Sequence, residues 1–171
     1  MTAPGDLLSE LGVLLERLTR LYQELAGVAR DMVTHMGWAD MDALHADVAR
    51  EEALIRQAQE QDGLRRQLLE LIGNGYGVAP MVARRMTSSQ LLRRVDPGRR
   101  PELEQIIRRL RRAAAELSEA NRLTGLASSQ VLTHMRELFA AMSRAEDAPA
   151  VYTRSGRTAL SGTRRIFETT G

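Results

Sequence analysis

The chain has no cysteine, few aromatic residues and no long apolar run. The absence of cysteine excludes disulfides and thiolate zinc sites. It also fits a protein of a reducing compartment, where disulfides are rare. Aromatic residues are only 4% of the 171 residues, so the core must use aliphatic side chains, which favours helices packed on helices. No run approaches the ~18–20 apolar residues of a membrane span, and no export signal opens the sequence. We therefore expect a cytoplasmic protein without stable membrane insertion.

Lysine is also absent, so every basic residue is arginine. The 24 basic residues are nearly offset by 22 carboxylates, which leaves a formal charge of +2. Clustered guanidinium groups can bind phosphates, but glutamates are interleaved among these arginines and no aromatic side chain lies there to stack on bases. Nucleic-acid binding is therefore the weakest of our hypotheses, and we expect no nucleic acid as partner. The arginine pairs are Arg93–Arg94, Arg99–Arg100, Arg108–Arg109 and Arg111–Arg112.

The strongest positive signal is a heptad-like seam between residues 103 and 142. Its positions step by four and three without a slip, and nine of the twelve are apolar. The three polar members, Asn121, Thr124 and Ser128, fall together in the middle. Such a period keeps one face of a long helix against a partner helix. We therefore predict one long helix with two apolar stretches and a polar layer between them. The positions are 103, 107, 110, 114, 117, 121, 124, 128, 131, 135, 138 and 142.

Two further long helices are predicted upstream. Leucines step by four and three from Leu7, which predicts a helix over residues 6–36 with Asp6 as N-cap. A break at residues 37–40 follows, and Asp40 can cap a second helix that runs to about Ile72. The apolar stripe of this second helix shifts near residues 57–63, where a kink or a loss of register is expected. The short break between two amphipathic helices indicates an antiparallel hairpin.

The remaining segments are short or polar. The glycine-rich stretch 73–77 ends the second helix, a short helix is predicted near residues 88–95, and Pro101 suits the first turn of the long helix. The predicted fold is all-α: an antiparallel bundle of three long coiled-coil-like helices, a short helix and a flexible C-terminal tail. We expect a helical bundle over 1–146, in which the late helix 101–145 carries the partner-binding face. Residues 147–171 would form a flexible tail with a short linear motif.

No pattern indicates catalysis. The glycine-rich stretch 73–77 lacks the Gly-Lys-Ser/Thr element of a phosphate-binding loop, and His35, His45 and His134 have no second ligand at metal-like spacing. There is no serine elbow and no strand scaffold for a buried site. We therefore expect no enzyme activity, no catalytic residue, no metal and no cofactor.

The late half of the seam instead suggests protein binding. Val131, Met135, Leu138 and Met142, hereafter the late seam, would form an apolar face that adapts to a partner helix because methionine is flexible. The sequence leaves two alternatives open. The face is either offered to another protein, or it is occupied by a second copy in a structural coiled-coil adaptor or self-associating scaffold, so a homodimer is possible.

Two short elements carry a resemblance to a known family. Residues Asn121–Gly125 (Asn-Arg-Leu-Thr-Gly) lie in the last long helix, and Tyr152–Gly156 (Tyr-Thr-Arg-Ser-Gly) come after it. Their order and spacing resemble the C-terminal signature of FlgN-type flagellar export chaperones. The second predicted helix, with Glu51–Ile55 and Arg65–Leu69, also looks like its counterpart in that family, so the resemblance covers essentially the whole chain.

The resemblance implies a cytoplasmic, non-catalytic secretion chaperone. It would bind the helical C-termini of the hook–filament junction proteins FlgK and FlgL and deliver them to the flagellar type III export apparatus. By this analogy the late helix and the segment after it hold the client, and Tyr152 contacts a component of the export gate. The expected partner-binding residues are Asn121, Leu123, Val131, Met135, Leu138, Met142, Tyr152 and Gly156.

Overall fold

The computed structural model describes residues 4–146 and contains only helices within that range. They are α1 (Pro4–Trp38), α2 (Met41–Gly75), α3 (Pro80–Arg84), α4 (Ser88–Arg94) and α5 (Arg100–Glu146). The described residues divide into two compact units between Gln130 and Val131, and α5 contributes to both. The prediction of an all-α bundle with three long helices is confirmed. The predicted tail, residues 147–171, lies outside the described residues.

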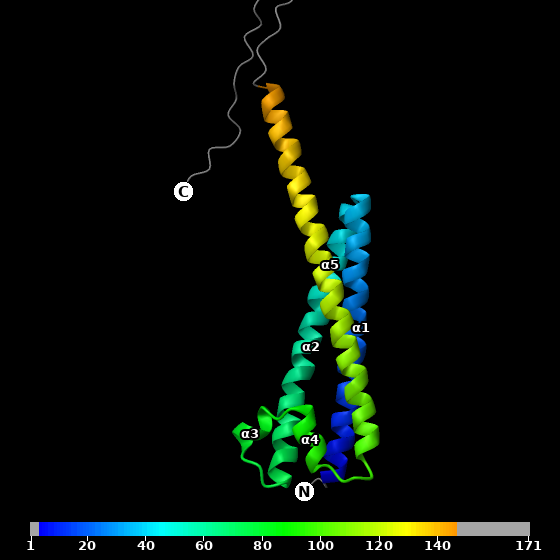
Figure 1. Cartoon of the computed structure of the whole chain (residues 1–171), viewed down its shortest axis with the longest axis vertical. Helices are drawn as coiled ribbons and strands as arrows, with labels where there is room; N and C mark the ends of the chain where they lie inside the picture. The colour runs from blue at the N-terminus through cyan, green and yellow to red at the C-terminus, as the bar shows by residue number, and fades with distance from the viewer. Residues whose placement is uncertain (1–3, 147–171) are drawn as a thin grey trace, which may run out of the picture. The chain divides into compact units, whose positions relative to one another are not determined.

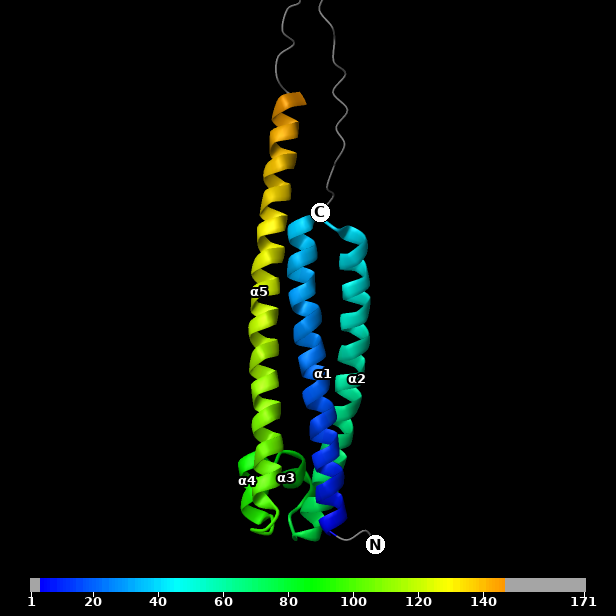
Figure 2. The same ribbon diagram turned by 90° about the vertical axis from the view of Figure 1, so that its right-hand side faces the viewer.

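In the first unit, α1 and α2 form the predicted antiparallel hairpin and lie side by side in both views (Figures 1 and 2). Ala39 makes the turn with a positive φ of 57°. Asp40 caps α2 as predicted, because its Oδ1 accepts a hydrogen bond of 3.0 Å from the Ala43 N–H. The prediction of Asp6 as N-cap is wrong. The helix begins at Pro4, which places Asp6 inside the first turn, where its charge complements the helix dipole.

Helix α2 runs unbroken through residues 57–63, where a kink or a loss of register was predicted. Asp62 stabilises this polar segment through ion pairs with Arg65 and Arg66, at 2.8 and 2.7 Å. Partial burial raises the pKa of the Asp62 carboxyl, but the two guanidinium groups outweigh it and hold that pKa below its ordinary value. Local ion pairs thus preserve the helix where its apolar stripe is interrupted.

The core of the first unit joins all four helices α1 to α4 and the first part of α5. The seam residues Leu103 and Ile107 are buried there, which confirms the start of the seam. The later seam positions 110, 114 and 117 are half-buried, and the other buried positions, 106, 113 and 120, each come one residue before a seam position. Farther along α1, Ala26 and Ala29 pack against Ala120 of α5, and these small side chains allow the two helices to approach closely. The largest fully buried side chains are Leu11, Leu18, Val28, Ile72 and Val95.

The segment between α2 and α5 contains the predicted short helix, α4, and one that was not predicted, α3. Gly73 near the end of α2 lies directly against α3, and a Cβ atom added there would overlap the Cβ of Ala83. A backbone hydrogen bond adds to this packing. The N–H of Val78, which comes just before α3, donates to the Gly73 carbonyl at 2.8 Å. Gly73 is therefore required for the close packing of α3 on α2.

Candidate partner-binding site

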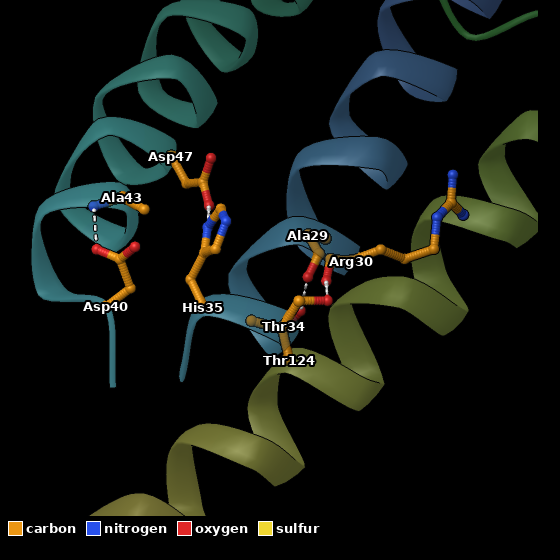
Figure 3. A network of polar contacts seen from close by, with 8 residues as sticks. All are labelled: Ala29, Arg30, Thr34, His35, Asp40, Ala43, Asp47 and Thr124. Atoms are coloured by element: carbon orange, nitrogen blue, oxygen red, sulfur yellow. Dashed lines mark hydrogen bonds and ion pairs between the residues drawn. The ribbon is translucent and has the colours of Figure 1, made fainter. Parts of the chain in front are cut away.

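Two of the three polar seam residues, Thr124 and Ser128, face α1 in the first unit, whereas Asn121 is exposed. The Thr124 hydroxyl lies 2.9 Å from the carbonyl oxygen of Ala29 on α1 (Figure 3). It also lies 3.0 Å from the carbonyl oxygen of Ala120 on its own helix, so its one proton has an acceptor on each helix. The Ser128 hydroxyl lies 3.5 Å from the sulfur of Met36 and 2.9 Å from the Thr124 carbonyl. These polar groups therefore join α5 to α1 beyond Ala120.

We expect Thr124→Val to lower the free energy of unfolding by about 1 kcal/mol, because the interhelical hydrogen bond is lost while the shape is kept. Thr34→Val is the matched control. Its hydroxyl is exposed and bonds only to the Arg30 carbonyl of its own helix, at 3.2 Å, so a change within about 0.5 kcal/mol is expected. Urea unfolding followed by circular dichroism measures both. Equal effects of the two substitutions would contradict an interhelical role for Thr124.

Beyond the polar layer, the late seam lies in the second unit. Every side chain from 131 to 143 is exposed. Val131 is 38% exposed, Met135 46%, Leu138 51% and Met142 60%. Four apolar side chains at spacings of four, three and four lie on one face of a helix. The predicted partner-binding face therefore exists as an accessible apolar surface.

Two residues that the sequence analysis missed broaden this surface. Leu132 is 54% exposed and Phe139 is 60% exposed. Each follows a member of the late seam by one residue, which is about 100° around the helix. The sequence did carry a signal for them, because Leu132 and Phe139 are seven residues apart and therefore lie on the same side of the helix. Together with the late seam they make an apolar stripe that is wider than a coiled-coil seam. The late seam, Leu132 and Phe139 are together called the exposed face.

The remaining predicted site residues do not join the exposed face. Asn121 and Leu123 are exposed in the first unit. Between them, Arg122 donates two hydrogen bonds to Glu119, at 2.7 and 2.8 Å, and these hold the pKa of the Glu119 carboxyl below its ordinary value. Tyr152 and Gly156 lie outside the described residues.

The sequence analysis treated the three histidines as isolated, but one of them, His35, has a close carboxylate partner. The Nδ1 of His35 on α1 lies 2.6 Å from Oδ2 of Asp47 on α2, and this pair ties the two helices together near the hairpin turn (Figure 3). Asp47 is buried. Among the described residues, no group of three or more His, Cys, Asp or Glu side chains could hold a metal ion. We interpret the pair as a structural contact.

Comparison with protein-family models identifies the class. The model described as FlgN protein matches residues 1–159. The chain therefore belongs to the FlgN family of flagellar export chaperones, which confirms the resemblance carried by Asn121–Gly125 and Tyr152–Gly156. This is a family of chaperones rather than enzymes, and its members bind flagellar export substrates.

No curated protein and no solved structure shows significant similarity to the chain. Within the part that the structure describes, none of the helices combines the length and apolar character needed to cross a bilayer.

Proposed function

We propose that this chain binds the helical C-termini of the hook–filament junction proteins FlgK and FlgL and delivers them to the flagellar type III export apparatus. The observation that supports the proposal best is the exposed face, in which six large apolar side chains are each at least 38% exposed. A contiguous apolar stripe of this kind is typical of a protein-interaction site.

The dimensions of the exposed face suit a helical client. Residues 131 to 142 span about 16 Å, or three turns of helix. A client helix with apolar residues at i, i+3, i+4 and i+7 can lie along such a stripe. Met135 and Met142 can adjust their rotamers to different side chains, which favours a site that accepts two related clients.

The role also fits the needs of exported subunits. A helical segment that assembles only outside the cell exposes apolar surface beforehand, and such surface promotes aggregation. A chaperone that covers this surface with its own helix prevents premature assembly and can release the client without chemistry. We accordingly propose a cytoplasmic protein that needs no cofactor of its own.

Tyr152 separates client binding from delivery in this proposal. We expect Tyr152→Ala to leave the affinity for a FlgK C-terminal segment within about twofold of the wild type and to reduce FlgK secretion at least about fivefold. An aromatic side chain offers a large contact area at a low cost in rotamer entropy, so its removal weakens contact with a gate component. Calorimetric titration measures the affinity, and immunoblotting of culture supernatants measures the secretion.

Tyr152→Phe is the matched control, since it keeps the aromatic ring and removes only the hydroxyl. Secretion close to the wild-type level is expected from this variant if the ring makes the contact. If Tyr152→Ala abolishes client binding instead, Tyr152 belongs to the client site and the separation of roles is wrong.

A further inference from the structure

A second surface of the first unit lies between α3 and α4. A groove of about 360 Å³ is lined by Val78, Val82, Met86, Gln90, Arg93 and Arg94, of which Met86 is buried. Val82 is 60% exposed, so an apolar side chain is accessible next to two guanidinium groups. Helices α3 and α4 lie beside the end of α2 (Figures 1 and 2), and the residues that line the groove are separate in sequence from the exposed face of α5.

The segment that forms this groove is strongly basic. Residues 71–95 contain four arginines and neither aspartate nor glutamate, in a chain whose formal charge is only +2. Arg84 is neutralised by Glu70, whose Oε2 lies 2.6 Å from the guanidinium Nε. Within residues 4–146, no ion pair is found for the side chains of Arg93 and Arg94, and both are exposed. The groove therefore carries two positive charges without compensation.

The wall that carries these charges is held in place by its own contacts. A capping box fixes the start of α4, because the Thr87 N–H donates to Gln90 Oε1 at 2.8 Å and the Gln90 N–H donates to the Thr87 hydroxyl at 3.3 Å. At its other end, Arg100 donates to the carbonyl oxygens of Val95 and Arg93, at 2.9 and 3.2 Å. A preformed wall lowers the entropic cost of binding.

We propose that this groove docks an acidic, amphipathic peptide segment of a partner protein. One or two apolar side chains would contact the exposed Val82 and the half-buried Val78, and neighbouring carboxylates would pair with Arg93 and Arg94. Arginine in the last turn of a helix also interacts favourably with the helix dipole, but that effect does not account for the exposed Val82 in the same groove. The lining contains no aromatic side chain on which a base could stack, and a concave groove suits a peptide better than a flat membrane.

The test uses a fluorescein-labelled helical peptide of about four turns with leucine on one face and glutamate on the other. Fluorescence anisotropy at about 0.1 M salt measures its affinity for the full chain and for two groove variants. We expect Arg93→Glu/Arg94→Glu and, separately, Val82→Asp each to weaken binding at least about tenfold. The peptide with glutamine in place of glutamate should bind at least about tenfold more weakly to the unaltered chain.

Arg108→Glu/Arg109→Glu is the control, because it makes the same change of charge at an exposed pair on α5. Binding within about twofold of the unaltered chain is expected for this variant, and circular dichroism melts verify that all variants are folded. The proposal is overturned if the glutamate peptide does not bind, or if the control loses as much affinity as the groove variant. Tighter, Arg93- and Arg94-dependent binding of a short DNA duplex or of phosphatidylglycerol vesicles would also overturn it.

Discussion

The double substitution Met135→Asp/Leu138→Asp is expected to raise the dissociation constant of a FlgK C-terminal segment at least about 100-fold, or about 2.7 kcal/mol. Both side chains lie at the centre of the exposed face, at 46% and 51% exposure. A bound client helix would bury the half of each side chain that is still exposed, which would contribute about 0.7–1.5 kcal/mol per residue. The substitutions remove this contribution and place two carboxylates where they would have to be desolvated. Calorimetric titration measures the change.

Ala140→Asp is the matched control on the same helix. Nine residues from Val131 correspond to two and a half turns, so Ala140 lies on the side of α5 opposite the late seam. It is exposed, and aspartate there lowers helix propensity to a comparable extent. Client affinity within about threefold of the wild type is expected. Unchanged affinity in the double variant would rule out the exposed face as the client site, whereas equal losses in both variants would indicate a general loss of helix.

Gly73→Ala should lower the free energy of unfolding by about 1–3 kcal/mol, the usual cost of overpacking. The added methyl group overlaps the Cβ of Ala83, so α3 must move away from α2. The same variant should weaken binding of the acidic peptide, because α3 forms one wall of the groove that contains Val82. Urea unfolding and anisotropy measure the two effects on the same protein.

Gly63→Ala serves as the control, because it should raise the free energy of unfolding instead of lowering it. Gly63 also lies within α2, but a Cβ added there meets no atom within 4 Å. Alanine loses less conformational entropy than glycine in a helix, so this variant should be more stable by about 0.5–1 kcal/mol. If Gly73→Ala is also stabilising, the close contact between α2 and α3 is not a feature of the folded protein.

Periodicity was enough to predict the three long helices and the buried start of the seam. Leu103 and Ile107 are in the core and Asp40 caps α2, because local spacing and side-chain chemistry determine both outcomes. The start of α1 was less predictable, since Pro4 and Asp6 both suit a first turn. Helix α3 was missed because its five residues are too few to display a period.

The contacts between distant residues could not be predicted from the sequence. Thr124 donates to Ala29, which lies 95 positions away, and His35 pairs with Asp47 across the hairpin. A strict seam interpretation also placed only Val131, Met135, Leu138 and Met142 on the partner-binding face. The accessible surface is wider, because in the described structure no second layer covers Leu132 and Phe139, which are 54% and 60% exposed.

Of the two elements that carry the family resemblance, the structure describes only Asn121–Gly125. Thr124, inside the Asn121–Gly125 element, joins α5 to α1, so part of that element has a packing role. Asn121 and Leu123 are exposed and stay predicted client contacts. Tyr152 and Gly156 stay predictions based on family resemblance, and secretion measurements test them independently of client binding.

The most direct test of the chaperone account is a calorimetric titration of the purified chain with a FlgK C-terminal segment, combined with light scattering. The account predicts saturable binding by the full chain and none by a chain that ends after Gln130, where the first unit ends. No heat from the full chain, together with a stable dimer in light scattering, would contradict it. The exposed face would then be occupied by a second copy, and the chain would be a self-associating scaffold.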